Sequence, residues 1–230
     1  MLSFVGSSAL CLVVFFSLVQ LFFSKKINQL KLINLSVKGQ LIFSLISFFI
    51  LIYAYIISDF SILNVFQNSH TTKPLIYKIS AVWGNHEGSM LLWILILTLF
   101  NYFLFKFYNL KNSKFILKSL ETQALITFGF SLFSLLTSNP FEKITPIPEN
   151  GLGFNPILQD PALAIHPPLL YIGYVGFSAV FSLSIATLKL NNDEKILWHL
   201  YMKPFVMVSW TFLTIGIMFG SIWAYYELGW

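Results

Sequence analysis

Residues 155–177 read NPILQDPALAIHPPLLYIGYVGF and join a proline-rich loop to a long apolar run. Seven of the nine prolines lie between positions 140 and 168, so the segment before the run cannot form regular structure. The run itself predicts a helix that begins at Pro168, because a proline in the first helical turn loses no hydrogen bond. His166 then lies at the junction, in the extended conformation that a residue before proline favours. The sequence therefore predicts a histidine that is held rigidly and can still reach a ligand.

The composition indicates an all-α, polytopic integral membrane protein. Hydrophobic residues make up 57% of the 230 residues and charged residues only 10%, which is outside the range of soluble domains. Several apolar runs approach or exceed the roughly 20 residues that a spanning helix needs. We expect a single transmembrane domain over residues 1–230, with about six spanning helices near 2–23, 39–58, 89–107, 119–138, 168–188 and 204–224. No basic residue precedes the first run, which favours a spanning helix over a cleavable signal peptide.

The lysines predict the orientation of these helices. Lysine and arginine together number 14, and all are lysine. Eleven lie in or beside three alternate connections, and only Lys73, Lys78 and Lys143 lie in the others. Connections rich in lysine face the cytoplasm or matrix. The N-terminus, the loops near 59–88 and 139–167, and the C-terminal tail are therefore predicted to face the periplasm or intermembrane space, together with His70, His86 and His166, while His199 faces inward.

The same charge pattern argues against several functions. The net charge of +5 follows from topology and does not indicate nucleic-acid binding. Glu121 lies near a helix end, and no charged residue falls in the middle of a predicted span, whereas proton pumps and ion-coupled transporters usually need one. Cys11 is the single cysteine and forms no intrachain disulfide or Cys-x-x-Cys pair. Lysine use without arginine suggests an AT-rich genome, and we favour a bacterial inner membrane over a mitochondrial one.

Two segments could hold a planar ligand on the outer face. A neutral imidazole is a good axial ligand for haem iron, so His166 is the first candidate, against the alternative of a loop histidine bonded locally. The tail WAYYELGW, residues 223–230, could form an aromatic platform or simply an aromatic belt at the headgroup level. Its candidate residues are Trp223, Tyr225, Tyr226 and Trp230, with Glu227 as a polar partner or a solvated residue.

A third segment is WGNHEGS, residues 83–89, at the predicted start of the third span. Adjacent His86 and Glu87 do not have the His-Glu-x-x-His spacing of a helical zinc site. Gly84 and Gly88 predict a tight backbone path. The alternative is a structural turn with Ser89 near the helix N-cap. Trp83, His86 and Glu87 are therefore candidate site residues without an assigned role.

Small residues predict which helices pack together. Gly216 and Gly220 form a small-xxx-small face in the last span, and Gly173 and Gly176 form a similar strip in the fifth. Such faces allow close helix packing in membranes. Packing these two spans against each other would bring His166 beside the aromatic tail.

These motifs, in this order, resemble a known family. The chain resembles the N-terminal part of CcmF, the haem-lyase subunit of cytochrome c maturation, within the haem-handling family that includes the NrfE and CcsA types. The resemblance runs nearly end to end and is densest in residues 58–65, 74–80, 82–89, 137–141, 155–177 and 220–230.

The resemblance implies a role in covalent haem attachment. Members take haem from the chaperone CcmE on the outer face and attach it to the Cys-x-x-Cys-His thiols of apocytochrome c, which CcmH presents. Two outward-facing histidines flank a tryptophan-rich "WWD" segment and ligate the haem. His166 matches the first of them, and Trp230 matches the first residue of the WWD core.

The second histidine and the WWD body belong to the remaining part of a CcmF, so we do not expect residues 1–230 to catalyse ligation alone. The resemblance thus predicts haem as cofactor, with CcmE, CcmH, apocytochrome c, the rest of CcmF and the lipid membrane as partners. Two alternatives stay open. The chain could be a haem transporter, exporter or membrane channel, or it could be a non-catalytic assembly subunit that docks the haem chaperone.

Overall fold

A computed structural model describes residues 1–107, 113–153, 155–190 and 198–229. Within them, six helices are long and apolar enough to cross a membrane: α1 (Leu2–Phe23), α2 (Leu30–Ile57), α5 (His86–Phe107), α6 (Ser113–Thr137), α7 (Pro161–Leu188) and α8 (Trp198–Leu228). The described residues contain no strand beyond an isolated antiparallel bridge between Ile62 and Lys143. The predicted all-α fold with six spans is confirmed, and the chain is an integral membrane protein.

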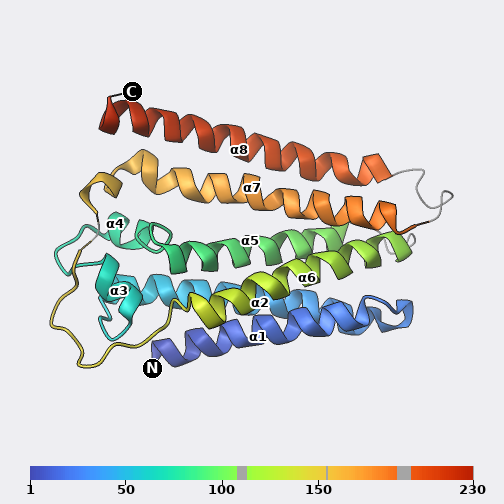
Figure 1. Cartoon of the computed structure of the whole chain (residues 1–230), viewed down its shortest axis with the longest axis horizontal. Helices are drawn as coiled ribbons and strands as arrows, with labels where there is room; N and C mark the ends of the chain where they lie inside the picture. The colour runs from blue at the N-terminus through green and yellow to red at the C-terminus, as the bar shows by residue number, and fades with distance from the viewer. Residues whose placement is uncertain (108–112, 154, 191–197, 230) are drawn as a thin grey trace.

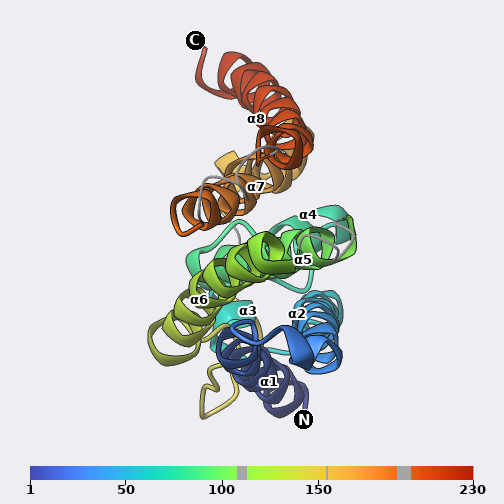
Figure 2. The same ribbon diagram turned by 90° about the vertical axis from the view of Figure 1, so that its right-hand side faces the viewer.

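The six long helices run roughly side by side and stack in successive layers (Figures 1 and 2). One layer contains α1 and α2, the next contains α5 and α6, and α7 follows with α8 outermost. The largest helix–helix interface joins α7 and α8, and the next joins α1 and α2. The helix α8 buries the smallest share of its apolar span.

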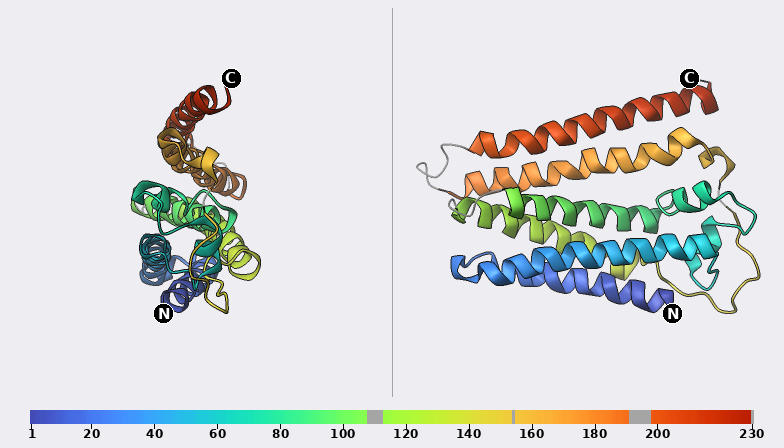
Figure 3. Two further views of the ribbon diagram at one scale, coloured as in Figure 1. Left: turned by 90° about the vertical axis from the view of Figure 1, so that its left-hand side faces the viewer. Right: turned by 180° about the vertical axis from the view of Figure 1, so that it is seen from behind.

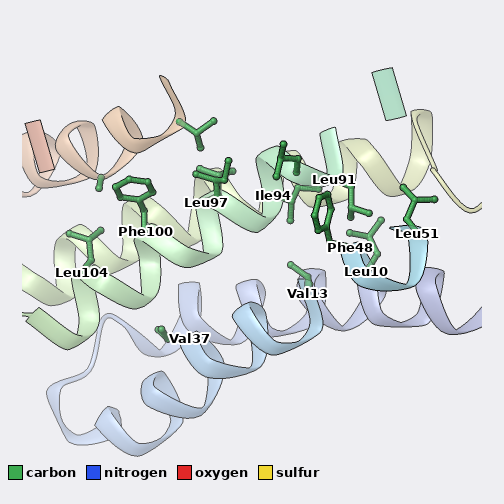
Figure 4. Packing of buried hydrophobic residues seen from close by; sticks show 14 of the residues in the cluster. Leu10, Val13, Val37, Phe48, Leu51, Leu91, Ile94, Leu97, Phe100 and Leu104 are labelled. Atoms are coloured by element: carbon green, nitrogen blue, oxygen red, sulfur yellow. The ribbon is translucent and has the colours of Figure 1, made fainter. Parts of the chain in front are cut away.

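The core lies between the first two layers and continues to α7. Fully buried leucine, isoleucine and valine side chains from α1, α2 and α5 meet there, as Figure 4 shows for Leu10, Val13, Leu51, Leu91 and Ile94. Burying one such side chain contributes about 1.5–3 kcal/mol when it leaves water, but lipid is as apolar as leucine. Inside a membrane this core therefore holds the helices chiefly by close packing.

Polar side chains cross-link the first four long helices at the level of the core. The Gln20 amide nitrogen of α1 donates to Asn101 Oδ1 of α5 and to the Leu120 carbonyl of α6, each at 2.9 Å. Gln40 of α2 donates to Gln20 Oε1 at 2.7 Å, and Asn101 donates to the same oxygen at 2.7 Å. All three side chains are fully buried. Their donors and acceptors therefore pair with one another or with backbone, and we call Gln20, Gln40 and Asn101 the amide cluster.

Several helices begin before the apolar runs that predicted them. Only α1 has the predicted bounds. The helix α2 begins at Leu30 and not near position 39, because exposed Lys31 and Lys38 extend their long stems toward the surface from its first turns. For the same reason α6 and α8 start about six residues early. The last helix also continues four residues past its predicted end, to Leu228.

The loops at one end of the bundle are tied to one another by backbone hydrogen bonds. The short helices α3 (Leu63–Asn68) and α4 (Leu75–Ser80), and the 3₁₀ turn η3 (Pro156–Leu158), lie at this end with both termini (Figures 1 and 3). Residues 141–153 of the proline-rich loop run beside residues 61–69. Backbone N–H groups connect Leu63 to Glu142, Leu152 to Phe66 and Gly153 to Ser69, at 2.8–3.0 Å. The loop is irregular, as its prolines predict, but it is fixed in place.

The two ends of the bundle carry different residues. His70, His86 and His166 belong to the end with α3 and α4, and His199 belongs to the opposite end with the α1–α2 connection (Figure 1). This is the grouping that the lysine count predicts. That the histidine end faces outward stays a prediction.

Candidate functional site

The candidate site begins where α7 does, seven residues before the predicted start. The helix starts at Pro161, and the Ala164 N–H donates to the Asp160 carbonyl at 2.9 Å. Pro161 occupies the first helical position, which suits its fixed φ. The prediction that Pro168 opens the helix is wrong, and so is the extended conformation for His166: both Pro167 and Pro168 lie inside α7.

A tryptophan pairs the carbonyl that the second of these prolines leaves without a donor. Pro168 has no N–H to offer to the carbonyl of Ala164, four residues earlier. The Trp83 indole N–H donates to that carbonyl at 3.0 Å, and the indole stacks on Phe48 with ring centroids 6.5 Å apart. A buried carbonyl that a proline leaves unpaired in a membrane helix is thus satisfied by a neighbouring element. Trp83 of the WGNHEGS motif therefore stabilises the turn of α7 that carries His166.

The rest of the motif forms a structural helix start. Asn85 Oδ1 accepts the Gly88 N–H at 2.8 Å, the arrangement of an N-cap residue. The expectation that Ser89 lies near the N-cap is wrong, because α5 already begins at His86 and Ser89 Oγ donates to the His86 carbonyl. The tight path is confirmed at Gly88, where a Cβ would overlap the Val82 carbonyl oxygen.

A polar network reaches this helix start from two other elements, and no sequence pattern predicts it. The Asn64 amide of α3 donates to Asn85 Oδ1 at 2.7 Å and to Glu87 Oε2 at 3.1 Å. The buried Tyr55 hydroxyl of α2 donates to Asn64 Oδ1 at 2.7 Å. Glu87 also suits the first turn of α5, where the helix dipole favours a negative charge. These contacts give Glu87 a structural part in holding α3 against α5.

His86 lies apart from His166. Its Nε2 is 3.0 Å from Ser138 Oγ at the end of α6, and its side chain is exposed. A cavity of about 350 Å³ lies between the motif and the first turns of α7, lined by Trp83, His86, Ser89, Ala164, Pro167 and Tyr171 among others. A second cavity of about 310 Å³ lies between α7 and α8 and is apolar, lined by Pro167, Leu170, Tyr171, Tyr174 and Leu213. Neither lining includes His166.

The His166 imidazole is half-buried between α7 and α8. Its Nδ1 lies 2.6 Å from the carbonyl oxygen of Gly216. A carbonyl oxygen can only accept, so Nδ1 carries the proton and the neutral ring keeps the lone pair on Nε2. A hydrogen bond at one ring nitrogen is the usual way to fix the tautomer and orientation of a metal-ligating histidine. The geometry therefore leaves Nε2 as the atom that can bind a metal.

Glycines make room for this ring, as the sequence predicts. A Cβ on Gly220 would overlap the imidazole, 2.8 Å from Nδ1. One turn apart along the interface, a Cβ on Gly216 would lie 2.9 Å from the Leu170 backbone nitrogen, and one on Gly173 would lie 2.7 Å from Leu213 Cα. The predicted close packing of the two helices through these residues is confirmed.

This packing also brings the helical part of the tail close to His166. Trp223 lies three residues after Gly220, and Glu227 lies seven residues after Gly220. Both positions therefore fall near the face of α8 that meets α7. Because α8 continues to Leu228, Tyr225 is rotated by about 200° from Trp223 and cannot share a face with it. Tyr225 and Tyr226 are 65% and 76% exposed, with rings in edge contact. Trp230 lies outside the described residues.

The described residues contain no group of three or more His, Cys, Asp or Glu that could hold a metal ion. A metal at His166 would have to bring most of its other ligands with it, which the iron of a porphyrin does. One fixed imidazole at the surface between two helices thus fits an axial ligand better than a protein-made metal cage.

Comparisons with known proteins give a consistent family. The family described as "Cytochrome C assembly protein" matches residues 83–230. The chain is 53% identical over 184 residues to the cytochrome c-type biogenesis protein CycK of Rhizobium meliloti, covering 80% of this chain and 27% of that protein. It is 42% identical over 185 residues to CcmF of Escherichia coli, covering 80% of this chain and 28% of the relative.

A solved structure shares the fold. The structure titled "Cytochrome c Heme Lyase CcmF" superposes with a TM-score of 0.83 at 24% identity, over 98% of this chain and 36% of that one. The chain therefore spans between a quarter and two fifths of the length of these proteins.

Proposed function

Because the chain belongs to the cytochrome c assembly protein family, we propose that it forms the N-terminal part of a CcmF-type haem lyase and supplies one axial ligand to haem on the outer face of the membrane. The observation that carries this proposal is the hydrogen bond between His166 Nδ1 and the Gly216 carbonyl, which leaves Nε2 free to bind iron. The predicted role of the whole chain is cytochrome c biogenesis, as the names of its relatives suggest.

In this proposal the protein orients haem and the cofactor supplies the difficult chemistry. When bound, haem provides the vinyl groups to which the cysteine thiols of apocytochrome c add. His166 fixes the iron relative to α7 and α8, and Trp223 lies about one turn beyond Gly220 along α8, with the exposed Glu227 one further turn on. Holding the reactants in one geometry is itself a large part of such catalysis. Tyr225 and Tyr226 stay weaker candidates, because they are exposed and Tyr225 points elsewhere.

The haem propionates need positive charge on the same end. The lysines available there are Lys73, Lys78 and Lys143, of which Lys78 Nζ already donates to Ser58 Oγ at 2.8 Å. Partial burial lowers the pKa of the Lys73 ammonium from its ordinary value. We propose that the missing charge comes from CcmE or from the rest of CcmF.

The rest of the complex follows from the resemblance. We propose that the remaining CcmF portion brings the second ligating histidine and the WWD body, that CcmE delivers haem, and that CcmH presents apocytochrome c. The chain spans 27–28% of CycK and CcmF, which supports a need for further residues. The bacterial relatives favour a bacterial inner membrane. Trp83 supports α7 through the Ala164 carbonyl and His86 bonds to Ser138, and we propose no part in haem binding for either.

A transport function receives less support. The polar side chains in the middle of the described bundle are neutral, and the amide cluster pairs its groups internally instead of lining an open path. The assembly-subunit alternative predicts docking without haem ligation, and the next experiment separates it from the main proposal.

The test is a haem titration of the purified full chain in detergent, followed by the Soret band. His166→Ala should weaken haem binding roughly tenfold or more, since even second-shell changes at metal sites cost 10–100-fold. His199→Ala, at the opposite end, is the matched control and should bind as the parent does. Imidazole added to His166→Gly should restore the parent spectrum. Equal haem affinity in His166→Ala and the parent would overturn the ligand role and leave the assembly-subunit alternative.

A further inference from the structure

A third cavity, with a distinct chemistry, lies at the end of the bundle opposite His166. It measures about 680 Å³ and is formed where the end of α1, the α1–α2 connection, the first turns of α6 and the end of α7 come together. Five lysines line it, from three separate parts of the chain: Lys25, Lys26, Lys114, Lys118 and Lys189. We call it the lysine cavity.

The cavity concentrates positive charge. Among the described residues Lys118 pairs with Glu121 at 2.9 Å, and Lys25, Lys26 and Lys189 add three further positive charges around the same space. Like charges this close repel one another, and the repulsion is relieved when an anion binds between them. Lys114 and Lys118 also lie in the first turns of α6, where the helix dipole adds to the attraction for an anion.

An unpaired buried hydroxyl points to a ligand independently of the lysines. Ser24 lines the cavity and is only 1% exposed, and among the described residues its Oγ has no hydrogen-bond partner. Buried polar groups are paired in the great majority of cases, so one that faces a cavity calls for an explanation. Asn28 and Gln29 line the same space with further amide donors. A ligand oxygen in the cavity would satisfy the Ser24 hydroxyl.

The position of the cavity selects the kind of anion. It lies at the ends of helices that span the membrane, and therefore at the depth of the lipid headgroups. Its lining also includes apolar Leu117 and Leu190, which suit the glycerol and upper acyl groups of a lipid better than a free ion. Basic pockets between transmembrane helices on the cytoplasmic side are suited to anionic headgroups.

We propose that the lysine cavity binds the phosphate of an anionic phospholipid from the inner leaflet, with the lysines as counter-charges and Ser24 as a hydrogen-bond donor. Lysine ammonium groups are point charges and make no bidentate fork. The site therefore selects charge more than headgroup shape, and a lipid with two phosphates binds more tightly than one with a single phosphate. This proposal does not depend on haem binding.

Native mass spectrometry of the full chain, with phosphatidylglycerol and phosphatidylcholine offered in turn, tests the proposal. The variant Lys25→Gln/Lys114→Gln/Lys189→Gln removes three charges from the cavity. The control Lys31→Gln/Lys38→Gln/Lys106→Gln removes three exposed lysines that do not line it. The cavity variant should lose phosphatidylglycerol affinity by roughly a hundredfold, and the control should change it much less.

Further arms identify the source of the phosphate and guard against misfolding. Phosphatidylglycerol should raise the melting temperature of the parent chain, whereas phosphatidylcholine, inorganic phosphate and pyrophosphate should not. If the triple variant does not fold, Ser24→Ala and Lys189→Gln alone should each weaken binding. Equal binding of the two lipids, equal loss in the two triple variants, or stabilisation by pyrophosphate as large as that by phosphatidylglycerol would each overturn the proposal.

Discussion

The helices α1, α2, α5 and α6 are joined by buried polar side chains, most densely toward the end of the bundle that holds the α1–α2 connection, whereas α7 and α8 are joined by glycines that let their backbones meet. In the first group the amide cluster of Gln20, Gln40 and Asn101 shares its hydrogen bonds among three helices. In the α7–α8 pair a histidine fills the space that Gly220 leaves. Both arrangements place polar atoms between membrane helices, but they use them differently.

The difference lies in which groups are left unpaired. The donors and acceptors of the amide cluster bond to one another and to backbone, so the cluster stabilises the bundle and leaves no polar atom for a ligand. His166 uses one nitrogen on the Gly216 carbonyl and keeps the other, so the glycine interface holds a binding atom in a fixed direction. A rigid support with one unused polar atom is what a ligand site requires. Three substitutions can break or sharpen this contrast.

The largest effect is expected from Gly220→Leu. The new side chain would overlap the imidazole and push α8 from α7, and overpacking of this kind costs about 1–3 kcal/mol or more. We expect a large drop in the free energy of unfolding, measured in mixed detergent by circular dichroism, together with loss of haem binding.

Gly129→Leu in α6 is the matched control, because a Cβ at Gly129 meets no atom within 4 Å. It should leave both stability and haem binding near those of the parent. If Gly220→Leu behaved like Gly129→Leu, the close approach of α7 and α8 around His166 would be wrong.

The second effect concerns the amide cluster alone. Gln20→Leu removes the donor to the buried Asn101 Oδ1 and one acceptor each from the Gln40 and Asn101 amide nitrogens, and a buried group left unpaired costs about 1–3 kcal/mol. Hydrogen bonds between membrane helices are often weaker, near 0.6 kcal/mol, so we expect a loss of about 1–2 kcal/mol in total. Haem binding by the folded fraction should not change, which distinguishes the cluster from the glycine interface.

The combined variant Gln20→Leu/Gln40→Leu/Asn101→Leu sharpens this test. It removes all the partners together, so it should recover part of the stability that Gln20→Leu loses. Ser17→Ala serves as the control, since Ser17 bonds only to the Val14 carbonyl of its own helix. If the triple variant lost more free energy of unfolding than the three single changes added together, the shape of these side chains, and not their hydrogen bonding, would hold these helices.

The sequence predicts these two regions unequally. Apolar length alone gives six spans and the bounds of α1, and spaced glycines give the packing of α7 on α8. The amide cluster has no local signal, because residues 20, 40 and 101 belong to three different helices and their pairing depends on tertiary structure. The predicted start of α7 is wrong for the same reason: Pro167 and Pro168 end a helix by local rules, and a distant side chain, Trp83, pairs the carbonyl that Pro168 leaves without a donor.

That distant side chain gives the smallest of the three effects. Trp83→Phe keeps an aromatic ring to pack on Phe48 but removes the N–H that reaches the Ala164 carbonyl. The net loss should be about 1 kcal/mol, the usual contribution of one hydrogen bond. Hydrogen exchange should rise in the first two turns of α7 and stay unchanged in α1 and α2.

Trp210→Phe, an exposed position on α8, is the control and should change neither. Because His166 lies in the affected turns, haem affinity should fall with Trp83→Phe by less than it falls with His166→Ala. If exchange in α7 did not respond, the prolines would be tolerated for a reason other than Trp83, and the WGNHEGS motif would need another role.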